Sequence, residues 1–316
     1  MYSKILRDDQ MARHFLSLLD FSEKEIRHLL DLALKLKSGE FEGAGKKLEG
    51  RTLAMLFEKP STRTRVSFEA AMTQLGGHAI YLDTTTTQLG RGETIEDTVR
   101  VLERYCDAIM ARVNKHEELE KMAAVSVVPI INGLSDKSHP TQTMADMLTV
   151  LEKKGKLDDM KVAFLGDCGF NMFHSTMAGF SKMWANVVGV CPEKKEYNPD
   201  PEIVAQVKKY AKGSIKIEHD PVKGVRDADI VYTDVWVSMG QENAEQRIKD
   251  LKPYQLNQKL LQHAKDDAIV MHCLPAHRGQ EITDDVFEGH QSVVFDQAEN
   301  RLHMHKAIML YLLECI

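Results

Sequence analysis

The sequence predicts an α/β protein with two doubly wound parallel sheets and an active site in the cleft between them. Short apolar runs typical of buried strands alternate with amphipathic helical patterns in two successive series. The 316 residues fit two domains at roughly 100–200 residues each. A polar stretch that follows Gly155 separates the series. We therefore expect one domain over residues 1–155, joined by a C-terminal helix over residues 297–316, and a second over residues 156–296.

The composition indicates a globular protein rather than a disordered or fibrous one, with 43% hydrophobic and 28% charged residues. The formal charge of −6 argues against a nucleic-acid partner. No apolar run approaches the roughly 18 residues of a membrane helix, and the first residues lack the apolar core of a secretory signal. Five scattered cysteines without a CxxC pair predict reduced thiols and no metal site. We expect a cytoplasmic protein that does not bind membranes.

The first series opens with a capping-box pattern, Ser22 and Glu25, ahead of an amphipathic helix over residues 22–37. A strand-like run then leads through a polar cluster into a second helical pattern. The expected strands of this series are residues 52–57, 107–113 and 125–131, and the later helices are residues 117–124 and 141–154. Gly155 is placed to end the last of these helices.

The second series contains five expected strands, at residues 161–165, 186–190, 215–217, 229–233 and 268–272. Asp200 and Pro201 are typical of a helix start. The final stretch, residues 297–313, has a helical pattern that turns a set of mainly apolar side chains inward: Ala307, Ile308, Leu310 and Tyr311. This helix could return to pack on the first domain.

The strongest candidate site is an anion site at the start of the second helix. Backbone N–H groups, hydroxyls and guanidinium groups converge there at the positive end of a helix dipole. Alternatively, Ser61 or Thr62 only caps the helix and the arginines form surface ion pairs. Two arginines and three hydroxyls within residues 61–65 favour the anion site. Arg112, at the end of its own strand, would add another guanidinium.

Polar residues at other strand ends suggest further substrate-binding groups. His139 could polarise a carbonyl oxygen and Gln142 could accept from an amide NH₂, although a lone histidine is more often structural. Asp234 with Ser238 suits an ammonium group, and Asn171 could bind a carboxylate from across the cleft. For Asp234 and Ser238 the alternative is a helix cap and a turn.

Several familiar chemistries lack support in the sequence. Cys273 directly follows His272 on an expected strand, so their side chains should point to opposite faces and cannot form a catalytic dyad. His303 and His305 are two residues apart on a helix with no carboxylate expected nearby, which indicates a structural region. No GxGxxG or GxxxxGK[ST] motif occurs, so the main sequence evidence for an NAD or ATP site is missing. We expect no cofactor.

Five motifs, in this order and over nearly the whole chain, resemble the aspartate/ornithine carbamoyltransferase family. They are STRTR at residues 61–65, HPTQ at 139–142, DVWVSMG at 234–240, HCLP at 272–275 and FDQAENR at 295–301. The first two are similar to the whole family, and the SMG and HCLP motifs to its ornithine-specific branch. In one departure, Phe170 stands where relatives have the first of two asparagines, whereas Asn171 is retained.

The resemblance implies roles for individual residues. Carbamoyl phosphate would be bound by Ser61, Thr62, Arg63, Thr64, Gln88, Arg112, His139, Gln142, Cys273, Leu274 and Arg301. The α-carboxylate and α-ammonium groups of ornithine would be bound by Asn171, Met239, Asp234 and Ser238. The catalytic residues would be Arg112, His139, Cys273 and Asp234. Gln88 would reach a neighbouring subunit's site, which implies a homo-oligomer, a trimer or a multiple of one.

The reaction implied is carbamoyl transfer to the δ-amine of ornithine without a covalent intermediate. Cys273 and Asp234 are candidates for favouring the neutral amine, and the segment 237–247 resembles a loop that closes over ornithine. A carbamoyltransferase for putrescine or N-acetylornithine is the nearest alternative, but neither amine matches both Asp234 and Asn171. A non-catalytic anion-binding protein and an NAD-linked oxidoreductase are more distant alternatives.

Overall fold

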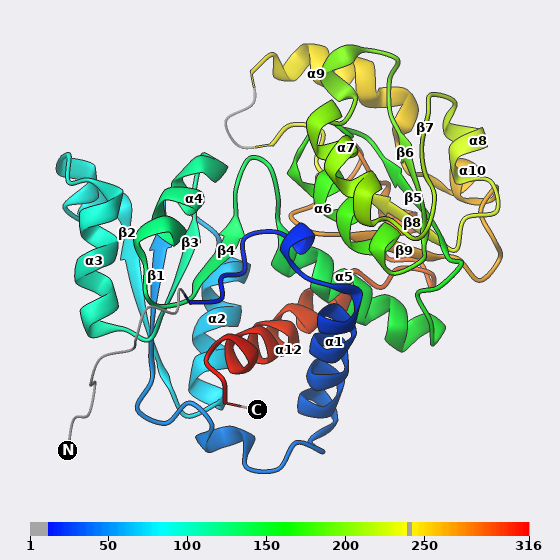
Figure 1. The fold of residues 1–316 in the computed structure, drawn as a ribbon. Coiled ribbons are helices and arrows are strands. Elements are labelled where there is room, and N and C mark those ends of the chain that lie inside the picture. The colour runs from blue at the N-terminus through cyan, green and yellow to red at the C-terminus, as the bar shows by residue number, and fades with distance from the viewer. Residues whose placement is uncertain (1–11, 239–241, 316) are drawn as a thin grey trace. The chain divides into compact units, whose positions relative to one another are not determined.

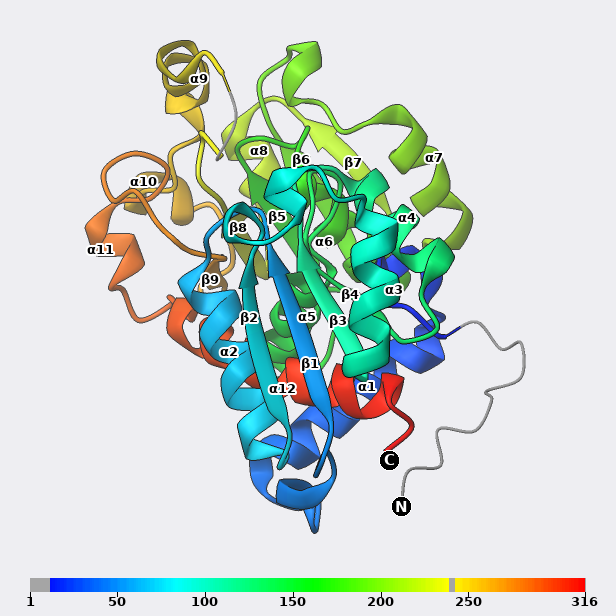
Figure 2. The ribbon, with the colours of Figure 1, turned by 90° about the vertical axis from the view of Figure 1, so that its left-hand side faces the viewer.

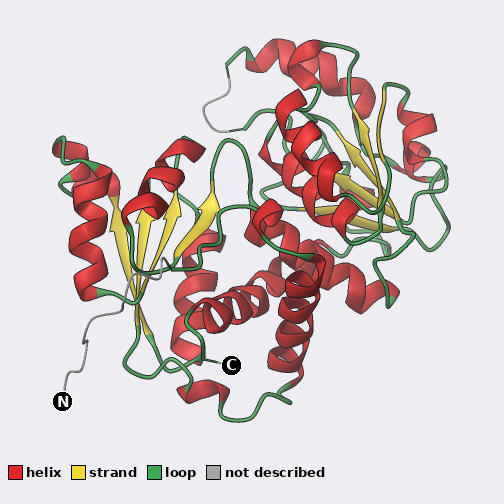
Figure 3. Ribbon diagram, in the orientation of Figure 1, coloured by secondary structure: helices red, strands yellow, loops and turns green. Residues whose placement is uncertain are grey.

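The computed structural model describes residues 12–238 and 242–315, and its chain divides into two compact units. Unit 1 contains the N-terminal segment through Leu16, Lys35–Asp136 and the C-terminal segment from His305. Unit 2 contains Ser17–Leu34 and Lys137–Met304. Each unit holds one sheet whose neighbouring strands are all parallel (Figures 1 and 3). The predicted fold class is thereby confirmed.

The sheet of unit 1 has the strand order β2-β1-β3-β4, and Figure 2 shows its first three strands side by side. The strands are β1 (Thr52–Phe57), β2 (His78–Asp83), β3 (Ala108–Arg112) and β4 (Ile130–Leu134). The helices are α2 (Thr62–Gln74), α3 (Ile95–Tyr105) and α4 (His116–Val125). Short 3₁₀ turns lie at Ala44–Lys46, Thr84–Thr86 and Leu89–Arg91. This order places α2 directly after β1 and α4 directly after β3, so both helices begin near the carboxyl ends of neighbouring strands.

The sheet of unit 2 has the order β7-β6-β5-β8-β9, and chain order reverses at β5, as in a doubly wound sheet. The strands are β5 (Lys161–Leu165), β6 (Asn186–Val190), β7 (Ile215–Glu218), β8 (Ile230–Thr233) and β9 (Ile269–His272). The helices within it are α5 (Pro140–Lys154), α6 (Asn171–Lys182), α7 (Pro201–Tyr210), α8 (Pro221–Val225), α9 (Ala244–Leu251), α10 (Gln258–Leu261) and α11 (Asp284–Phe287). Further 3₁₀ turns are Leu18–Asp20, Lys195–Tyr197 and Lys252–Tyr254.

Two helices contribute residues to both units: α1 (Glu23–Ser38) and α12 (Val294–Leu312). The predicted capping box at the start of α1 is confirmed. The Glu25 N–H donates to Ser22 Oγ at 3.2 Å, and the Ser22 N–H donates to Glu25 Oε2 at 2.8 Å. Gly155 ends α5 with a φ of 74°, a left-handed conformation that glycine adopts without steric cost.

Close packing in unit 2 depends on one small residue in α6. A Cβ on Gly179 would lie 2.7 Å from Thr143 Cγ2 in α5 and 2.8 Å from Leu18 Cδ1. Glycine therefore lets α6 approach α5 and the Leu18 turn. On the sheet, the rings of Phe164 and Tyr232 stack at 5.2 Å between centroids.

Two predicted boundaries are wrong in position, and several elements were not assigned from the sequence: β2 and α3 in unit 1, and α6, α8, α9, α10 and α11 in unit 2. The strand expected at 125–131 is β4, which starts at Ile130, because the Ser126 hydroxyl bonds the Val128 backbone in a local turn ahead of Pro129. The helix α12 begins about a turn before residue 297. The edge strand β2 is only partly buried and has no continuous apolar run, which explains why it was missed. The helix α3 does carry an apolar stripe, Ile95, Val99 and Leu102, that the sequence analysis overlooked.

Within the described ranges, no helix is both long and apolar enough to cross a membrane. By its contacts α5 belongs to unit 2. The division at residue 155 into two substrate-binding domains stays a prediction.

Candidate active site

The anion site expected in unit 1 lies at the start of α2. Ser61 is the N-cap residue, and its Oγ accepts from the Thr64 N–H at 3.3 Å. Thr64 is fully buried, whereas Arg63 is half-buried and Thr62 is exposed. Ser61 thus caps the helix, as the alternative interpretation held. A phosphate bound here would compete with Ser61 Oγ for the same N–H.

The anion site includes a second cation from the neighbouring strand. Arg112 is the last residue of β3, is 7% exposed, and pairs in register with Phe57 at the end of β1. Its carbonyl oxygen accepts from the Glu58 N–H at 2.9 Å, which ties the end of β3 to the segment leading into α2. Arg112 therefore lies at the same sheet edge as Ser61.

Lys59 is a third cation at this edge that the sequence analysis did not single out. Burial lowers the pKa of its ammonium group, and the positive charge of Arg112 lowers it further. The two cations are thus close enough to repel each other, which is typical of a site that binds an anion. The one signal for Lys59 in the sequence is its position between β1 and the STRTR motif.

Arg65, by contrast, is not directed toward the anion site. Its Nε donates to Glu69 Oε1 at 2.9 Å, and its guanidinium lies 3.9 Å from the centroid of the Tyr81 ring. The expectation that both arginines of the motif serve the anion is therefore corrected. Arg65 is four residues before Glu69 on one helix face, so a surface ion pair forms instead.

We expect the substitution Ser61→Ala to lower the free energy of unfolding by about 1 kcal/mol, because the Thr64 N–H loses its cap. If the site binds carbamoyl phosphate, as the sequence resemblance implies, the KM for that substrate should also rise. Urea denaturation and steady-state kinetics measure the two effects. The matched control is Thr94→Ala, which removes the N-cap of α3, where Thr94 Oγ1 accepts from the Asp97 N–H at 3.2 Å. An equal rise in KM for both variants would contradict the assignment.

Gln88 lies between the turns Thr84–Thr86 and Leu89–Arg91 and is exposed. It lines a cavity of about 290 Å³ whose floor is largely leucine. The lining residues are Leu56, Leu82, Thr87, Gln88, Leu89, Glu93, Thr98, Val101 and Leu102. An exposed amide here is compatible with the predicted contact to another subunit, which stays a prediction.

His139 and Gln142 lie at the start of α5 in unit 2. His139 is the N-cap residue and is 5% exposed, and its N–H donates to Ser175 Oγ at 2.7 Å. Gln142, one turn into the helix, is 1% exposed and donates from Nε2 to Asp146 Oδ1 at 2.9 Å. Its Oε1 is buried and has no hydrogen-bond partner among the described residues. A buried acceptor left open in this way suits the amide donor expected from the sequence.

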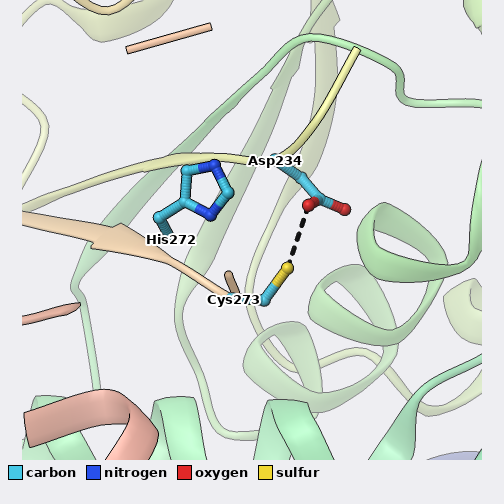
Figure 4. A group of neighbouring side chains, drawn as sticks. All are labelled: Asp234, His272 and Cys273. Carbon is cyan, nitrogen blue, oxygen red and sulfur yellow. Dashed lines mark hydrogen bonds between the residues drawn. The ribbon is translucent and has the colours of Figure 1, made fainter. Parts of the chain in front are cut away.

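Asp234 and Cys273 come together because their strands are neighbours. Thr233 of β8 pairs in register with His272 of β9, so the next residue of each strand emerges at one point of the sheet edge. The Cys273 thiol donates to Asp234 Oδ1 at 2.9 Å, as the dashed line in Figure 4 shows. Burial is the main cause that raises the pKa of the Asp234 carboxyl group. A half-buried carboxylate beside a thiol can bind a cationic amine and influence its protonation.

The sequence argument that separated His272 from Cys273 is wrong in its geometry. A ring nitrogen of His272, Cys273 Sγ and a carboxylate oxygen of Asp234 all lie within 4.8 Å of one another (Figure 4). Strand alternation does not apply because β9 ends at His272, and Leu274 then adopts a φ of 60°.

A cysteine–histidine dyad is nevertheless not formed. His272 Nδ1 accepts from the Leu274 N–H at 2.9 Å, so the ring proton lies on Nε2, which donates to Glu281 Oε1 at 3.1 Å. Both ring nitrogens are therefore occupied and cannot take a proton from Cys273. A metal ion at these three residues would have to displace one of the two hydrogen bonds, so the donor set does not favour one.

The remaining predicted residues of unit 2 are buried or half-buried. Asn171 is the first residue of α6 and is 2% exposed, Arg301 in α12 is 3% exposed, and Ser238 and Leu274 are half-buried. Met239 lies outside the described residues. His303 contacts Glu299 at 3.4 Å, so the expectation of no nearby carboxylate is wrong, because Glu299 lies one turn before His303 on the same helix.

One ion pair joins the segment around Asn171 to the segment after Asp234. Arg247 of α9 pairs with Asp167 and donates from Nε to the Trp236 carbonyl oxygen at 3.1 Å. Asp167 Oδ1 also accepts from the Gly169 N–H at 2.9 Å. The two contacts of Arg247 tie α9 to the segments that carry Asn171 and Asp234, which are expected to bind ornithine.

Comparison with known proteins identifies the family. The model described as aspartate/ornithine carbamoyltransferase, carbamoyl-P binding domain, matches residues 13–152. The model for the Asp/Orn binding domain matches residues 158–312. The chain belongs to the aspartate/ornithine carbamoyltransferase family.

Individual members of the family are similar over most of their length. The ornithine carbamoyltransferase of Staphylothermus marinus is 53% identical over 305 residues, covering 94% of this chain and 96% of the relative. The anabolic ornithine carbamoyltransferase of Pyrococcus furiosus is 53% identical over 303 residues, covering 94% and 95%. The solved ornithine carbamoyltransferase of Pyrococcus furiosus has a TM-score of 0.90 at 53% identity, covering 95% and 96%. That of Thermus thermophilus has a TM-score of 0.85 at 41% identity, covering 94% and 98%.

Proposed function

We propose that this chain transfers the carbamoyl group of carbamoyl phosphate to the δ-amine of L-ornithine, giving L-citrulline and phosphate. The observation that carries the proposal is the roughly half-identical match, over nearly the whole chain, to relatives named ornithine carbamoyltransferase. The relative named anabolic supports a role in arginine biosynthesis. The two family models support a carbamoyl phosphate domain ahead of residue 155 and an ornithine domain after it.

In the proposed reaction, the anion site of unit 1 binds the phosphate group. Ser61, Thr62, Arg63 and Thr64 hold it through the start of α2, and Arg112 adds a guanidinium from β3. Arg112 and His139 stabilise the oxyanion that develops on the carbamoyl oxygen. Arg301 and the backbone carbonyls of Cys273 and Leu274 complete the contacts to the carbamoyl group.

The second substrate is held by groups of unit 2. Asn171 and the Met239 N–H bind the α-carboxylate of ornithine, and Asp234 and Ser238 bind its α-ammonium. Cys273 lies beside the δ-amine, which must lose its proton to become a nucleophile. The neutral amine then attacks the carbamoyl carbon, phosphate leaves with the electrons of the C–O bond, and the proton released by the attacking nitrogen goes to the departing phosphate.

We infer a cytoplasmic homotrimer in which Gln88 completes a neighbouring subunit's site. The five cysteines are free thiols in the described part of the chain, which fits a reducing compartment. The exposure of Gln88 fits a contact to another subunit. Light scattering should give about three times the mass of the 35.8 kDa chain or a multiple of that; a monomer with full activity would contradict this.

The experiment that tests the function is an assay with carbamoyl phosphate and, separately, L-ornithine, putrescine, N-acetylornithine, L-lysine and L-aspartate. We expect a ureido product from ornithine alone, because the proposed site offers Asp234 to an α-ammonium and Asn171 to an α-carboxylate. Turnover of another amine would show that ornithine is not the second substrate. The assignment of carbamoyl phosphate as the first substrate would remain. Phosphate binding without any turnover would favour the anion-binding protein.

A further inference from the structure

Asp146 is a fully buried carboxylate in α5 that the proposed reaction does not use directly. Its Oδ1 accepts from Gln142 Nε2 at 2.9 Å and from Gln297 Nε2 at 2.7 Å. Its Oδ2 accepts from the Tyr232 hydroxyl at 3.2 Å. The four side chains come from α5, β8 and α12, so the carboxylate connects three elements of unit 2.

The chemistry of these contacts determines how Gln142 is oriented. An ionised carboxylate can only accept hydrogen bonds, so the NH₂ end of the Gln142 amide must face Asp146. The carbonyl end then points away, which agrees with Gln142 Oε1 having no hydrogen-bond partner among the described residues although the side chain is 1% exposed. A carbamoyl group carries an NH₂ that donates to an acceptor of this kind.

The same network reaches the end of β9. Gln297 Oε1 accepts from the His272 N–H at 2.9 Å, and Gln297 Nε2 also donates to the Tyr232 hydroxyl oxygen at 3.0 Å. His272 directly precedes Cys273 and Leu274, whose carbonyl groups are also assigned to the carbamoyl end. When Asp146 is ionised, the contacts of Asp146, Tyr232 and Gln297 are consistent with one another, and the acceptor that stays open is Gln142 Oε1.

We propose that Asp146 is a positioning residue for carbamoyl phosphate, which holds the Gln142 amide so that Oε1 accepts from the carbamoyl NH₂. The inference rests on the proposed function, since it assigns the open acceptor of Gln142 to that substrate. Asp146 itself touches no substrate. Its protonation state should therefore govern the KM for carbamoyl phosphate.

The groups that face Asp146 are Gln142 from α5, Tyr232 from β8, and Gln297 and Arg301 from α12. Burial raises the pKa of Asp146 to about 7, against the lowering effects of the three hydrogen bonds and of the Arg301 charge. The pKa of Tyr232 lies well above its usual value, so its hydroxyl stays protonated. As the pH falls through 7, Asp146 gains a proton and no longer constrains the Gln142 amide.

The test compares Asp146→Leu with the isosteric Asp146→Asn. At pH 8 the leucine variant should raise the KM for carbamoyl phosphate roughly tenfold, with a smaller change in kcat, because one hydrogen bond to the substrate is lost. The asparagine variant has one acceptor oxygen and one donor group, as protonated Asp146 does, so its KM should be raised at pH 8 and should not follow the titration of Asp146. From pH 8 to pH 6 the wild-type KM should rise toward that of Asp146→Asn, whose KM should change little over the same range. Parallel pH profiles would overturn the proposal, even if Asp146→Leu fails to fold.

A double variant and a matched control separate positioning from general loosening of the fold. If Asp146 acts through Gln142, then Gln142→Ala with Asp146→Leu should raise the KM no more than Gln142→Ala alone. The control, Thr149→Val, removes the buried contact between Thr149 Oγ1 and Asn300 Nδ2 at 2.9 Å, one turn further along α5. Additive effects, or an equal KM rise in Thr149→Val, would overturn the proposal. If the wild-type protein forms citrulline and Asp146→Leu keeps its KM, only the role of Asp146 fails; if it forms none, the proposed function fails as well.

Discussion

The substitution Asp234→Asn should lower kcat/KM for ornithine by a factor of about 10²–10³, because removing one partner of a charge pair at this half-buried position costs about 3–4 kcal/mol. Asparagine has nearly the same shape but cannot neutralise the α-ammonium group. It also presents an NH₂ group where the Cys273 thiol now donates at 2.9 Å. Steady-state kinetics with varied ornithine measure the loss. The KM for carbamoyl phosphate should change much less.

The matched control for Asp234 is Asp229→Asn, at the opposite end of β8. Asp229 is more buried than Asp234, at 5% exposure, and it contacts Lys265 Nζ at 2.6 Å. This variant should lose stability but keep its ornithine KM. Because burial raises the pKa of Asp234, the wild-type activity that depends on its charge should be lost on acidification earlier than for an exposed aspartate. Equal ornithine kinetics in Asp234→Asn and the wild-type protein would remove Asp234 from the site.

Replacing Lys182 with Met should lower the free energy of unfolding by about 3 kcal/mol, since buried carbonyl groups left unsatisfied cost about 1–3 kcal/mol each. The Lys182 ammonium donates to the carbonyl oxygens of Leu18 and Phe21, both at 2.6 Å, and to that of Leu19 at 3.3 Å. The side chain is 4% exposed, so water cannot easily replace these donors. Methionine fills a similar volume and offers no donor. Urea denaturation measures the loss.

The matched control for Lys182→Met is the same substitution at the exposed Lys212. Its ammonium lies 5.9 Å from the Trp184 ring centroid, and the side chain remains in solvent. We expect Lys212→Met to change the free energy of unfolding by less than about 0.5 kcal/mol. A Lys182→Met variant as stable as Lys212→Met would show that the three carbonyl contacts contribute nothing to stability.

Most strands could be predicted because a buried parallel strand needs a continuous apolar run. Residues 52–57, 161–165 and 186–190 have this pattern, and β1, β5 and β6 have the same limits. Where burial is partial, as in β2, the run is interrupted and the signal is lost. The strand predicted at residues 125–131 starts too early, because a side-chain hydrogen bond of Ser126 makes a turn in an otherwise apolar stretch.

For the candidate site, the sequence identified residue types but not their directions. Motif positions pointed to both Arg63 and Arg65, yet only the structure shows that Arg65 turns to Glu69 and Tyr81. Spacing alone also placed His272 and Cys273 on opposite faces, whereas the end of β9 and the backbone at Leu274 bring them within reach of Asp234.

By itself the sequence determined the parallel α/β fold class, the capped start of α2 at Ser61, and the family to which the chain belongs. These follow from local patterns: apolar runs, helix caps and motifs of adjacent residues, which need no knowledge of distant parts of the chain. Only the tertiary structure decided the contact of Asp234 with Cys273, the tautomer of His272, and the network that joins Asp146 to Gln142, Tyr232 and Gln297. These contacts join residues up to 151 positions apart. The sheet order and the packing of α5 against its neighbours bring such residues together, and no local pattern encodes them.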